Sequence, residues 1–346
     1  MTRRFPRYGF TRIDGGLMRI GDFWRYSILA GLAVIAMLIA VACGSEGKSG
    51  PIVLIEQDWD GQTVTTAVVR ILLEEEMGLE VVQKFAAADS AAMFAGLESG
   101  DFHFACCNWP SFSAAFVEEF VDTKGTVERL GPNGILGTSH WYIPRYVIEG
   151  DPDRDIEPVA PNLRTYKDMN QYKELFATAD TGAKGRFLDH TPAWDYRNQE
   201  RLDVLGVEFE VVYAGSEAAA FAELDAAYKR GDPFILVVWT PHWSVAKYDL
   251  VPVELPPHQE GCYVAGMDLS VAKFDCGFPI DDVAKLAWPK LKEEFPKAYK
   301  FLRDFKMTND QLNAMVLAKV DGGKTDEQVA REWINANKDV WESWIP

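Results

Sequence analysis

Three tryptophans stand where an aromatic ring could bind a cation, because each belongs to a segment at the end of an apolar run that is expected to be a strand. The three segments are Trp59-Asp60-Gly61-Gln62, Asn108-Trp109-Pro110-Ser111 and Trp239-Thr240-Pro241-His242-Trp243. The face of an indole ring carries partial negative charge, so several faces arranged as a box attract a cation that donates no hydrogen bonds. Trp59, Trp109 and Trp239 therefore predict a site for a quaternary ammonium compound.

The net charge of the chain disfavours some classes of binding partner. The 346 residues include 35 Lys+Arg against 52 Asp+Glu, which gives a formal net charge of −17. Such a chain repels the phosphates of nucleic acid, and a purely anionic ligand would also bind poorly. A zwitterion needs a second pole, which the backbone N–H groups of the helix expected from 61 onward could provide for a carboxylate.

The loops that hold these tryptophans need a sheet to position them. Strands are expected at 52–55, 79–85, 102–108, 206–212 and 234–239, and helices at 64–78, 90–97, 165–176 and 217–229. Alternating strands and helices predict largely parallel sheets covered by helices, in which ligands bind beyond the carboxyl ends of the strands. From Asp281 onward the pattern becomes helical, and its tryptophans fit helix packing: Trp288, Trp333, Trp341 and Trp344.

The first 42 residues are expected to be an export signal. They carry six Arg and two Asp, and their last 17 residues are uncharged and mostly apolar. The small residues before Cys43, with the segment 44–50 after it, resemble a bacterial lipoprotein signal. That resemblance implies cleavage before Cys43, lipid attachment to its thiol, a flexible tether over 43–50 and an extracytoplasmic location. An uncleaved membrane anchor and a true start at Met18 stay open.

Four further cysteines divide into two pairs. Cys106 and Cys107 lie in an apolar run, which favours two buried thiols over a disulfide between neighbours. Cys262 and Cys276 flank a short segment and are candidates for a disulfide in an oxidising compartment. The sequence contains no CxxC motif and no Cys/His cluster, so a metal site is not expected.

Several motifs together resemble the glycine betaine substrate-binding proteins of ABC importers. They are Gly-Ser-Glu-Ala-Ala-Ala at 215–220, Ala-Ala-Tyr-Lys-Arg-Gly-Asp-Pro at 226–233, Val-Trp-Thr-Pro-His-Trp at 238–243 and Lys-Tyr-Asp-Leu at 247–250. The segments 59–78 and 108–110 are also similar to that family. The resemblance covers most of the chain from about 52 to 344, and the Trp-Thr-Pro-His-Trp run is its most specific part.

The resemblance implies an α/β, two-lobed periplasmic-binding-protein-like (type II) fold. Each lobe is then a mostly parallel sheet flanked by helices, with 51–145 and 265–346 in lobe I and 146–264 in lobe II. The protein would capture glycine betaine or a related quaternary ammonium compound and deliver it to an ABC transporter permease. Neither a cofactor nor an enzymatic activity is implied.

The family's aromatic cage carries over residue by residue. Trp109 matches the aromatic residue of the Asn-Trp-Pro loop, and Trp239 matches that of the Trp-Thr-Pro-His-Trp loop. Trp194 is similar to the cage tryptophan of the second lobe. Choline-type members use additional aromatic residues, for which Trp59 and Tyr142 are the candidates.

The carboxylate pole carries over to His242 and to the N–H groups of Gly61 and Gln62. Proline betaine, choline and carnitine remain alternative ligands, and a sensor accessory that presents the bound ligand remains an alternative role. An enzyme is disfavoured, since neither Ser111 nor Ser216 lies in a Gly-x-Ser-x-Gly motif.

Overall fold

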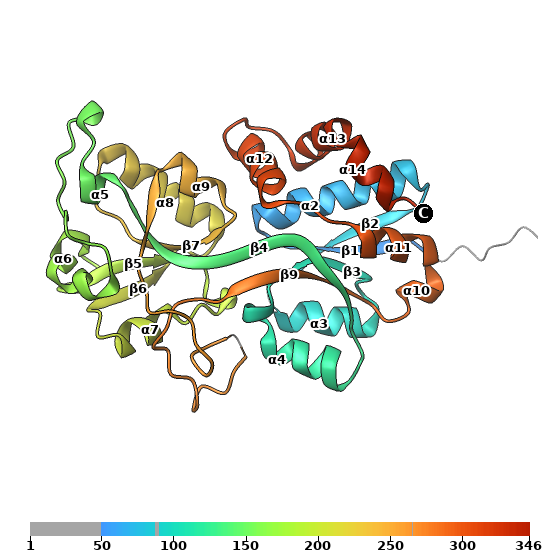
Figure 1. Ribbon diagram of the computed structural model, residues 1–346, viewed down its shortest axis with the longest axis horizontal. Helices are drawn as coiled ribbons and strands as arrows, with labels where there is room; N and C mark the ends of the chain where they lie inside the picture. Colours follow the sequence, from blue (N-terminus) through green and yellow to red (C-terminus); the bar gives the residue numbers. More distant parts are fainter. Residues whose placement is uncertain (1–49, 87–89, 265) are drawn as a thin grey trace, which may run out of the picture. The chain divides into compact units, whose positions relative to one another are not determined.

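Strands from both halves of the chain join one nine-stranded sheet. The computed structural model describes residues 50–86, 90–264 and 266–346 (Figure 1). The strands in these ranges are β1 (Ile52–Glu56), β2 (Val81–Phe85), β3 (Phe104–Asn108), β4 (Glu128–Pro144), β5 (Gly185–Asp189), β6 (Phe209–Tyr213), β7 (Leu236–Thr240), β8 (Leu250–Val253) and β9 (Ile280–Ala287). Their order is β2-β1-β3-β9-β4-β7-β5-β6, and β8 pairs with β4.

Parallel pairing dominates the two ends of this sheet, and antiparallel pairing its middle. At one end β1 pairs in parallel with β2 and β3, and at the other β5 pairs in parallel with β6 and β7. Between them, β4 and β9 pair antiparallel with each other and with their neighbours β7 and β3. Parallel neighbours require crossover connections, which the helices supply. The predicted α/β class is therefore confirmed.

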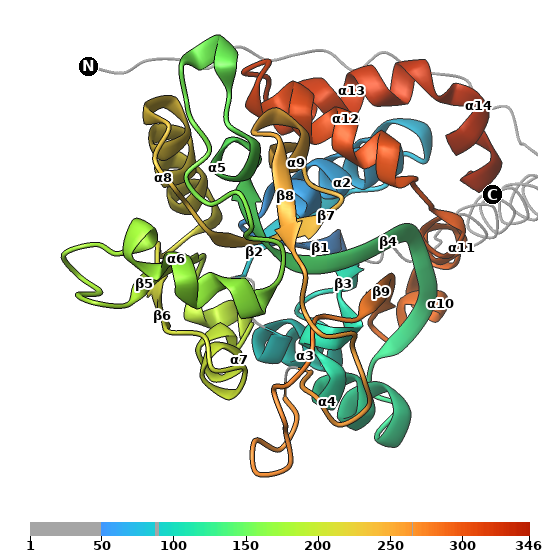
Figure 2. The same cartoon turned by 60° about the vertical axis from the view of Figure 1, so that its left-hand side comes forward.

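Helices cover the sheet at both ends (Figures 1 and 2). Those of the described residues are α2 (Asp60–Ile71), α3 (Ser90–Ser99), α4 (Ala114–Phe116), α5 (Tyr146–Glu149), α6 (Met169–Phe176), α7 (Asn198–Val204), α8 (Glu217–Arg230), α9 (Trp243–Lys247), α10 (Leu291–Glu294), α11 (Pro296–Asp304), α12 (Asn309–Val320), α13 (Asp326–Ala336) and α14 (Lys338–Trp341). The tail helix α13 packs on α2, and its Trp333 stacks on Trp344 at a centroid distance of 6.0 Å.

The helical pattern expected from Asp281 onward is wrong for its first seven residues, which form β9. Pairing with both β3 and β4 overrides the local pattern. Lys285, within this segment, is fully buried. Its ammonium donates to the carbonyls of Arg303 (2.6 Å) and Phe305 (2.5 Å), and burial lowers the pKa of Lys285 to about 7.

The long strand β4, which spans 17 residues, was also not foreseen from the sequence. It runs between the two groups of helices, in contact with β9 along one stretch and with β7 and β8 along another (Figure 1). Its register with β9 shifts near Gly134, which has a φ of 92°. A Cβ there would lie 2.3 Å from the carbonyl oxygen of Met307, so only glycine fits this approach.

A buried arginine and a disulfide hold the loop before β9. The structure joins Cys262 and Cys276, the pair suggested by the sequence, with 6.0 Å between their Cα atoms. Arg201 of α7 is fully buried and donates to the carbonyl of Cys276 at 2.8 Å and to that of Tyr196 at 3.0 Å. Its guanidinium lies over the Phe278 ring at 4.2 Å.

The expected export signal over 1–42, Cys43 and nearly all of the 43–50 tether lie outside the described residues. Within 50–86, 90–264 and 266–346, no helix combines the length and the apolar character that crossing a bilayer requires.

Candidate functional site

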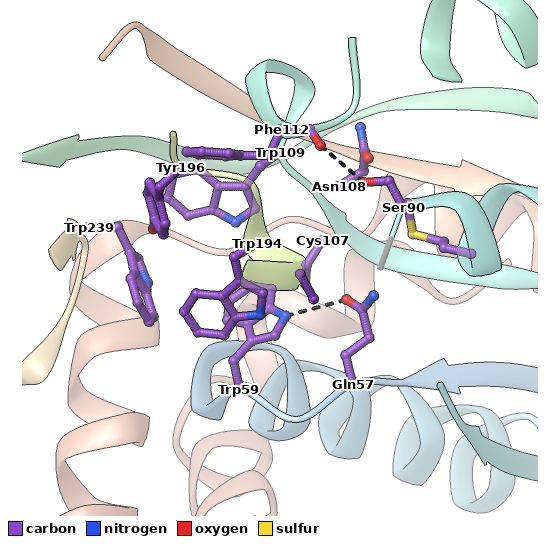
Figure 3. A pocket seen from close by; sticks show the side chains of 12 residues that line it. Gln57, Trp59, Ser90, Cys107, Asn108, Trp109, Phe112, Trp194, Tyr196 and Trp239 are labelled. Carbon is purple, nitrogen blue, oxygen red and sulfur yellow. Dashed lines mark hydrogen bonds between the residues drawn. The ribbon is translucent and has the colours of Figure 1, made fainter. Parts of the chain in front are cut away.

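Four tryptophans line one cavity of about 100 Å³ (Figure 3). They are Trp59, Trp109, Trp194 and Trp239; the first three follow the ends of β1, β3 and β5, and Trp239 is the last residue but one of β7. The rest of the lining is Gln57, Ser90, Met93, Cys107, Asn108, Phe112, Ala193 and Tyr196. None of these described lining residues is a lysine, arginine, aspartate or glutamate, so the wall combines aromatic surface with neutral polar groups.

Trp239 is the centre of the aromatic contacts. Its ring lies edge-on to Trp194, at a centroid distance of 5.3 Å and an interplanar angle of 75°. Trp59 lies at 6.4 Å and 90° from the same ring, and the His242 ring at 4.5 Å. Edge-to-face pairs of this kind are favourable and fix the direction of each ring face. Trp239 is only 6% exposed, so its orientation is set by packing.

Two glycines allow the other rings to lie close to the backbone. A Cβ on Gly61 would lie 2.8 Å from Cζ3 of Trp59, and one on Gly137 would lie 2.3 Å from Cη2 of Trp109. Real side chains do not approach this closely, so each ring occupies the space that a missing side chain leaves free. In addition, Nε1 of Trp59 donates to Oε1 of Gln57 at 3.3 Å.

The loop that carries Trp109 is fastened to β9. Both the backbone N–H and the hydroxyl of Ser111 donate to the Asp281 carboxylate, at 2.9 Å and 2.5 Å. Ser113 donates to Oδ1 of Asn108 at 2.8 Å. Burial raises the pKa of Asp281, while the two Ser111 bonds lower it. A strand from the last quarter of the chain thus positions a loop from the first third.

A second, smaller cavity of about 20 Å³ shares one wall with the first. Trp59, Cys107, Trp109 and Trp239 line both cavities. The smaller one is further lined by Gly61, Asn133, Ile135, Pro241, His242, Val283, Leu312, Asn313 and Val316. Trp194 and the predicted carboxylate-binding residues Gly61 and His242 therefore lie on opposite sides of the shared wall.

Two predicted site residues line neither cavity. Tyr142 is 4% exposed within β4, where its ring stands edge-on to His140 at 6.0 Å. Gln62 is 1% exposed, and its side-chain amide donates to the carbonyl of Ile55 at 2.8 Å. The backbone N–H of Gln62 donates to the carbonyl of Trp59 at 3.1 Å.

His242 is paired with a buried glutamate. Its Nδ1 accepts the backbone N–H of Ser244 at 3.2 Å, so the proton of the neutral ring belongs on Nε2. Nε2 lies 3.1 Å from Oε1 of Glu217, to which it donates. Burial lowers the pKa of His242 to about 3, which keeps the ring neutral, and burial together with Asp60 raises the pKa of Glu217.

The expectation of two buried thiols at Cys106 and Cys107 is wrong, since the structure joins their sulfurs in a disulfide between neighbours. Cys106 is 2% exposed, with its sulfur 3.6 Å from Oγ1 of Thr66, and Cys107 lines the cavities. The apolar run correctly indicated burial of Cys106, whereas Cys107 is only partly buried. Burial, however, does not report the oxidation state of adjacent sulfurs.

Sequence reasoning missed several residues of this site. Gln57, Asn108, Phe112 and Tyr196 line the larger cavity and lie within three residues of a predicted tryptophan. The strand-end rule that singled out the tryptophans applies equally to these neighbours. Glu217 was read only as the start of a helix, and no local signal indicated its pairing with His242. The described residues contain no cluster of His, Cys, Asp or Glu that could hold a metal ion.

The arrangement of strands and helices is that of the periplasmic-binding-protein fold. Lactococcal OpuAC in complex with glycine betaine shares the fold at a TM-score of 0.63 and 19% identity, over 86% of this chain and 100% of that chain. An ABC-transporter choline binding protein in complex with choline shares it at 0.62 and 19%, over 85% and 92%.

The chain belongs to the OpuAC family, the substrate binding domain of ABC-type glycine betaine transport systems, which it matches over residues 50–336. A trimethylamine N-oxide-binding protein of Pelagibacter ubique is 29% identical over 91% of this chain and 97% of its own length. A glycine betaine/proline betaine-binding periplasmic protein of Salmonella typhimurium is 24% identical over 93% and 97%.

Proposed function

We propose that the protein captures glycine betaine or a related methylated ammonium compound in a cage made by Trp59, Trp109, Trp194 and Trp239. The observation that carries this proposal is the convergence of four indole rings on one cavity of about 100 Å³. A trimethylammonium group donates no hydrogen bonds and is weakly hydrated, so aromatic faces compete well with water for it. The captured ligand is then delivered to an ABC importer.

The relatives support this ligand class and widen the set of candidates. The Pelagibacter ubique protein is named for trimethylamine N-oxide, and the Salmonella typhimurium protein for glycine betaine and proline betaine. All three compounds carry a methylated, positively charged nitrogen. We therefore expect the nitrogen end of the ligand to be held in the same way whichever of them is bound.

Titration calorimetry on the purified full-length protein in detergent tests the proposal. The panel is glycine betaine, proline betaine, choline, carnitine and trimethylamine N-oxide, with proline and ammonium as controls that lack N-methyl groups. At least one methylated compound is expected to bind and to change the tryptophan emission. If no member of the panel releases or absorbs heat, the cage proposal is wrong.

We further propose that the cage closes between two lobes, 51–145 with 265–346 and 146–264. The crossing strand β4 and the segment before β9 would connect them. Two cage tryptophans belong to each lobe, namely Trp59 and Trp109 to the first and Trp194 and Trp239 to the second. A ligand that contacts both pairs stabilises the closed form, which lets an importer distinguish loaded from empty protein.

The proposed attachment to the membrane depends on Cys43. In Cys43→Ser, the thiol that would be acylated is absent, so the protein is expected to leave the detergent phase in a Triton X-114 partition. Gly44→Ala, beside it, is the matched control and should still partition with detergent. Unchanged partition of Cys43→Ser would favour an uncleaved anchor instead.

A further inference from the structure

Three backbone N–H groups at the start of α2, those of Asp60, Gln62 and Thr63, already have acceptors within the protein. The backbone N–H of Asp60 donates to Oε2 of Glu217 at 3.1 Å. The N–H groups of Gln62 and Thr63 both donate to the carbonyl of Trp59, each at 3.1 Å. A carboxylate at a helix start is normally held by such N–H groups. Here, the carboxylate of Glu217 fills that role.

His242 is held by the same glutamate, and we call the group of Asp60, Glu217 and His242 the corner. Nε2 of His242 donates to Oε1 of Glu217 at 3.1 Å, so the two oxygens of Glu217 take the Asp60 N–H and the His242 N–H. Both side chains are enclosed, with exposed fractions of 4% for Glu217 and 6% for His242. Glu217 therefore takes two donors, the Asp60 N–H and the His242 ring N–H, that a ligand carboxylate would otherwise use here.

The lysine that contacts the start of α2 also has all of its hydrogen-bond donors engaged. Lys319 of α12 contacts Oδ1 of Asp60 at 2.9 Å, Oδ1 of Asp326 at 2.8 Å and Oγ1 of Thr63 at 2.9 Å. An ammonium group has three donors, and all three are used. The described lining of both cavities contains no lysine or arginine that could pair with a carboxylate in its place.

We infer that Glu217 is a specificity-determining residue that acts through His242 and Asp60, and that it makes the site prefer methylated ammonium ligands without a carboxylate. This inference rests on the proposed function and narrows it to the class of choline and trimethylamine N-oxide. A ligand carboxylate would have to displace Glu217 and leave a buried acid without its donors, which is costly. A hydroxyl or an N-oxide oxygen makes no such demand.

The preference does not depend on the charge of Glu217. An ionised Glu217 adds negative charge beside Asp60 and repels a second carboxylate, while it favours a bare cation. A protonated Glu217 still lies against both donors and keeps them from the ligand. In either state the corner favours a ligand whose charged part is its methylated nitrogen.

The test compares ligands of matched size within each variant by calorimetry. Choline and glycine betaine differ mainly in a hydroxymethyl group against a carboxylate. Wild type is expected to bind choline or trimethylamine N-oxide at least tenfold more tightly than glycine betaine. An amide has only one acceptor oxygen, so Glu217→Gln releases one donor for a ligand carboxylate, and that ratio should fall about tenfold.

Glu223→Gln is the matched control, because Glu223 lies on the same helix and pairs at the surface with Arg186 at 2.7 Å. It should keep the wild-type ratio. Wild type that binds glycine betaine as tightly as choline and trimethylamine N-oxide overturns the inference without any variant, and so does a ratio unchanged in a folded Glu217→Gln. The absence of binding to every ligand would instead overturn the proposed function.

Discussion

The residues of this site are of two kinds: some provide the binding surface, and others leave room for it. The tryptophans supply aromatic faces, while Gly61 and Gly137 leave room for the rings of Trp59 and Trp109. Trp239 has the most ring contacts of the four tryptophans and is the most buried. Removing it would both delete one face and release its neighbours.

Trp239→Ala is therefore expected to weaken ligand binding by roughly tenfold or more, since one cation–π face contributes about 0.5–2 kcal/mol and contact area is lost as well. Calorimetry with the tightest ligand of the panel measures this. Trp333→Ala, in the tail helix α13, is the control, because Trp333 is buried away from both cavities. It should lower the free energy of unfolding and leave the affinity of the folded protein intact.

Wild-type affinity in Trp239→Ala together with lost affinity in folded Trp333→Ala would place the site elsewhere.

The tryptophans could be predicted from sequence because they stand at strand ends, and strand ends are visible as apolar runs followed by polar loops. Trp194 required the family resemblance, since its turn follows a strand (β5) that the pattern did not indicate. Glu217 could not be predicted. Its contacts to Asp60 and His242 join residues 157 and 25 positions away, and no local pattern encodes such contacts.

At the scale of elements, the start of α8 sets the position of Glu217. Ser216 is the N-cap of this helix: its backbone is extended, and its hydroxyl accepts the N–H of Ala219 at 3.2 Å. At the other end, the helix stops at Gly231, which has αL backbone. The cap thus fixes where the helix begins and which residue occupies its first position.

Ser216→Ala should lower the free energy of unfolding by about 1 kcal/mol, the usual cost of a lost N-cap. Because Glu217 follows directly, the ratio of choline to glycine betaine affinity should also decrease. Urea denaturation and calorimetry measure the two effects. Thr325→Ala, which removes the corresponding cap of α13, should cost similar stability without changing the ratio. Equal effects of both variants on the ratio would contradict a role for the α8 cap.

Most of the parallel strands and several of the helices followed from periodicity and glycine positions, whereas β4, β5 and β9 did not. β4 carries three glycines and two prolines, which favour turns, and β9 carries a buried lysine and two aspartates. Both are strands because of what they pair with. Long-range pairing decides such segments, and propensity within a short window does not.

For the whole molecule, buried titratable groups predict how stability depends on pH. Burial lowers the pKa of His190 and of His242 to about 3. Between pH 6.5 and 3, both histidines are therefore protonated in the unfolded chain and neutral in the folded chain. Each histidine then costs about 1.4 kcal/mol of stability per pH unit as the pH falls from 6.5 toward 3. Burial raises the pKa of Asp189 to about 6, which has the opposite sign and offsets one histidine between pH 6 and 4.

In urea titrations the two histidines are therefore expected to lower the free energy of unfolding below pH 6.5, against the opposing contributions of Asp189, Glu217 and Asp281, whose pKa values burial raises. Asp189→Asn removes the offset, so its stability should fall more steeply than that of wild type between pH 6 and 4. Asp203→Asn, at an exposed position of α7, should follow the wild-type slope. A shallower slope in Asp189→Asn would show that the sign assigned to Asp189 is wrong.

The place of β9 in the sheet has a consequence for how the chain is made. Residues 280–287 lie between β3 and β4, so β3 has no partner on that side until four fifths of the polypeptide has been synthesised. During this interval β3 presents an open edge, which can pair with the same edge of another nascent copy. Lys285 then has a role before folding is complete. Its charge makes an isolated β9 segment a poor partner for the sheet of another molecule. Within its own sheet the charge is accommodated, because the carbonyls of Arg303 and Phe305 accept hydrogen bonds from its ammonium group.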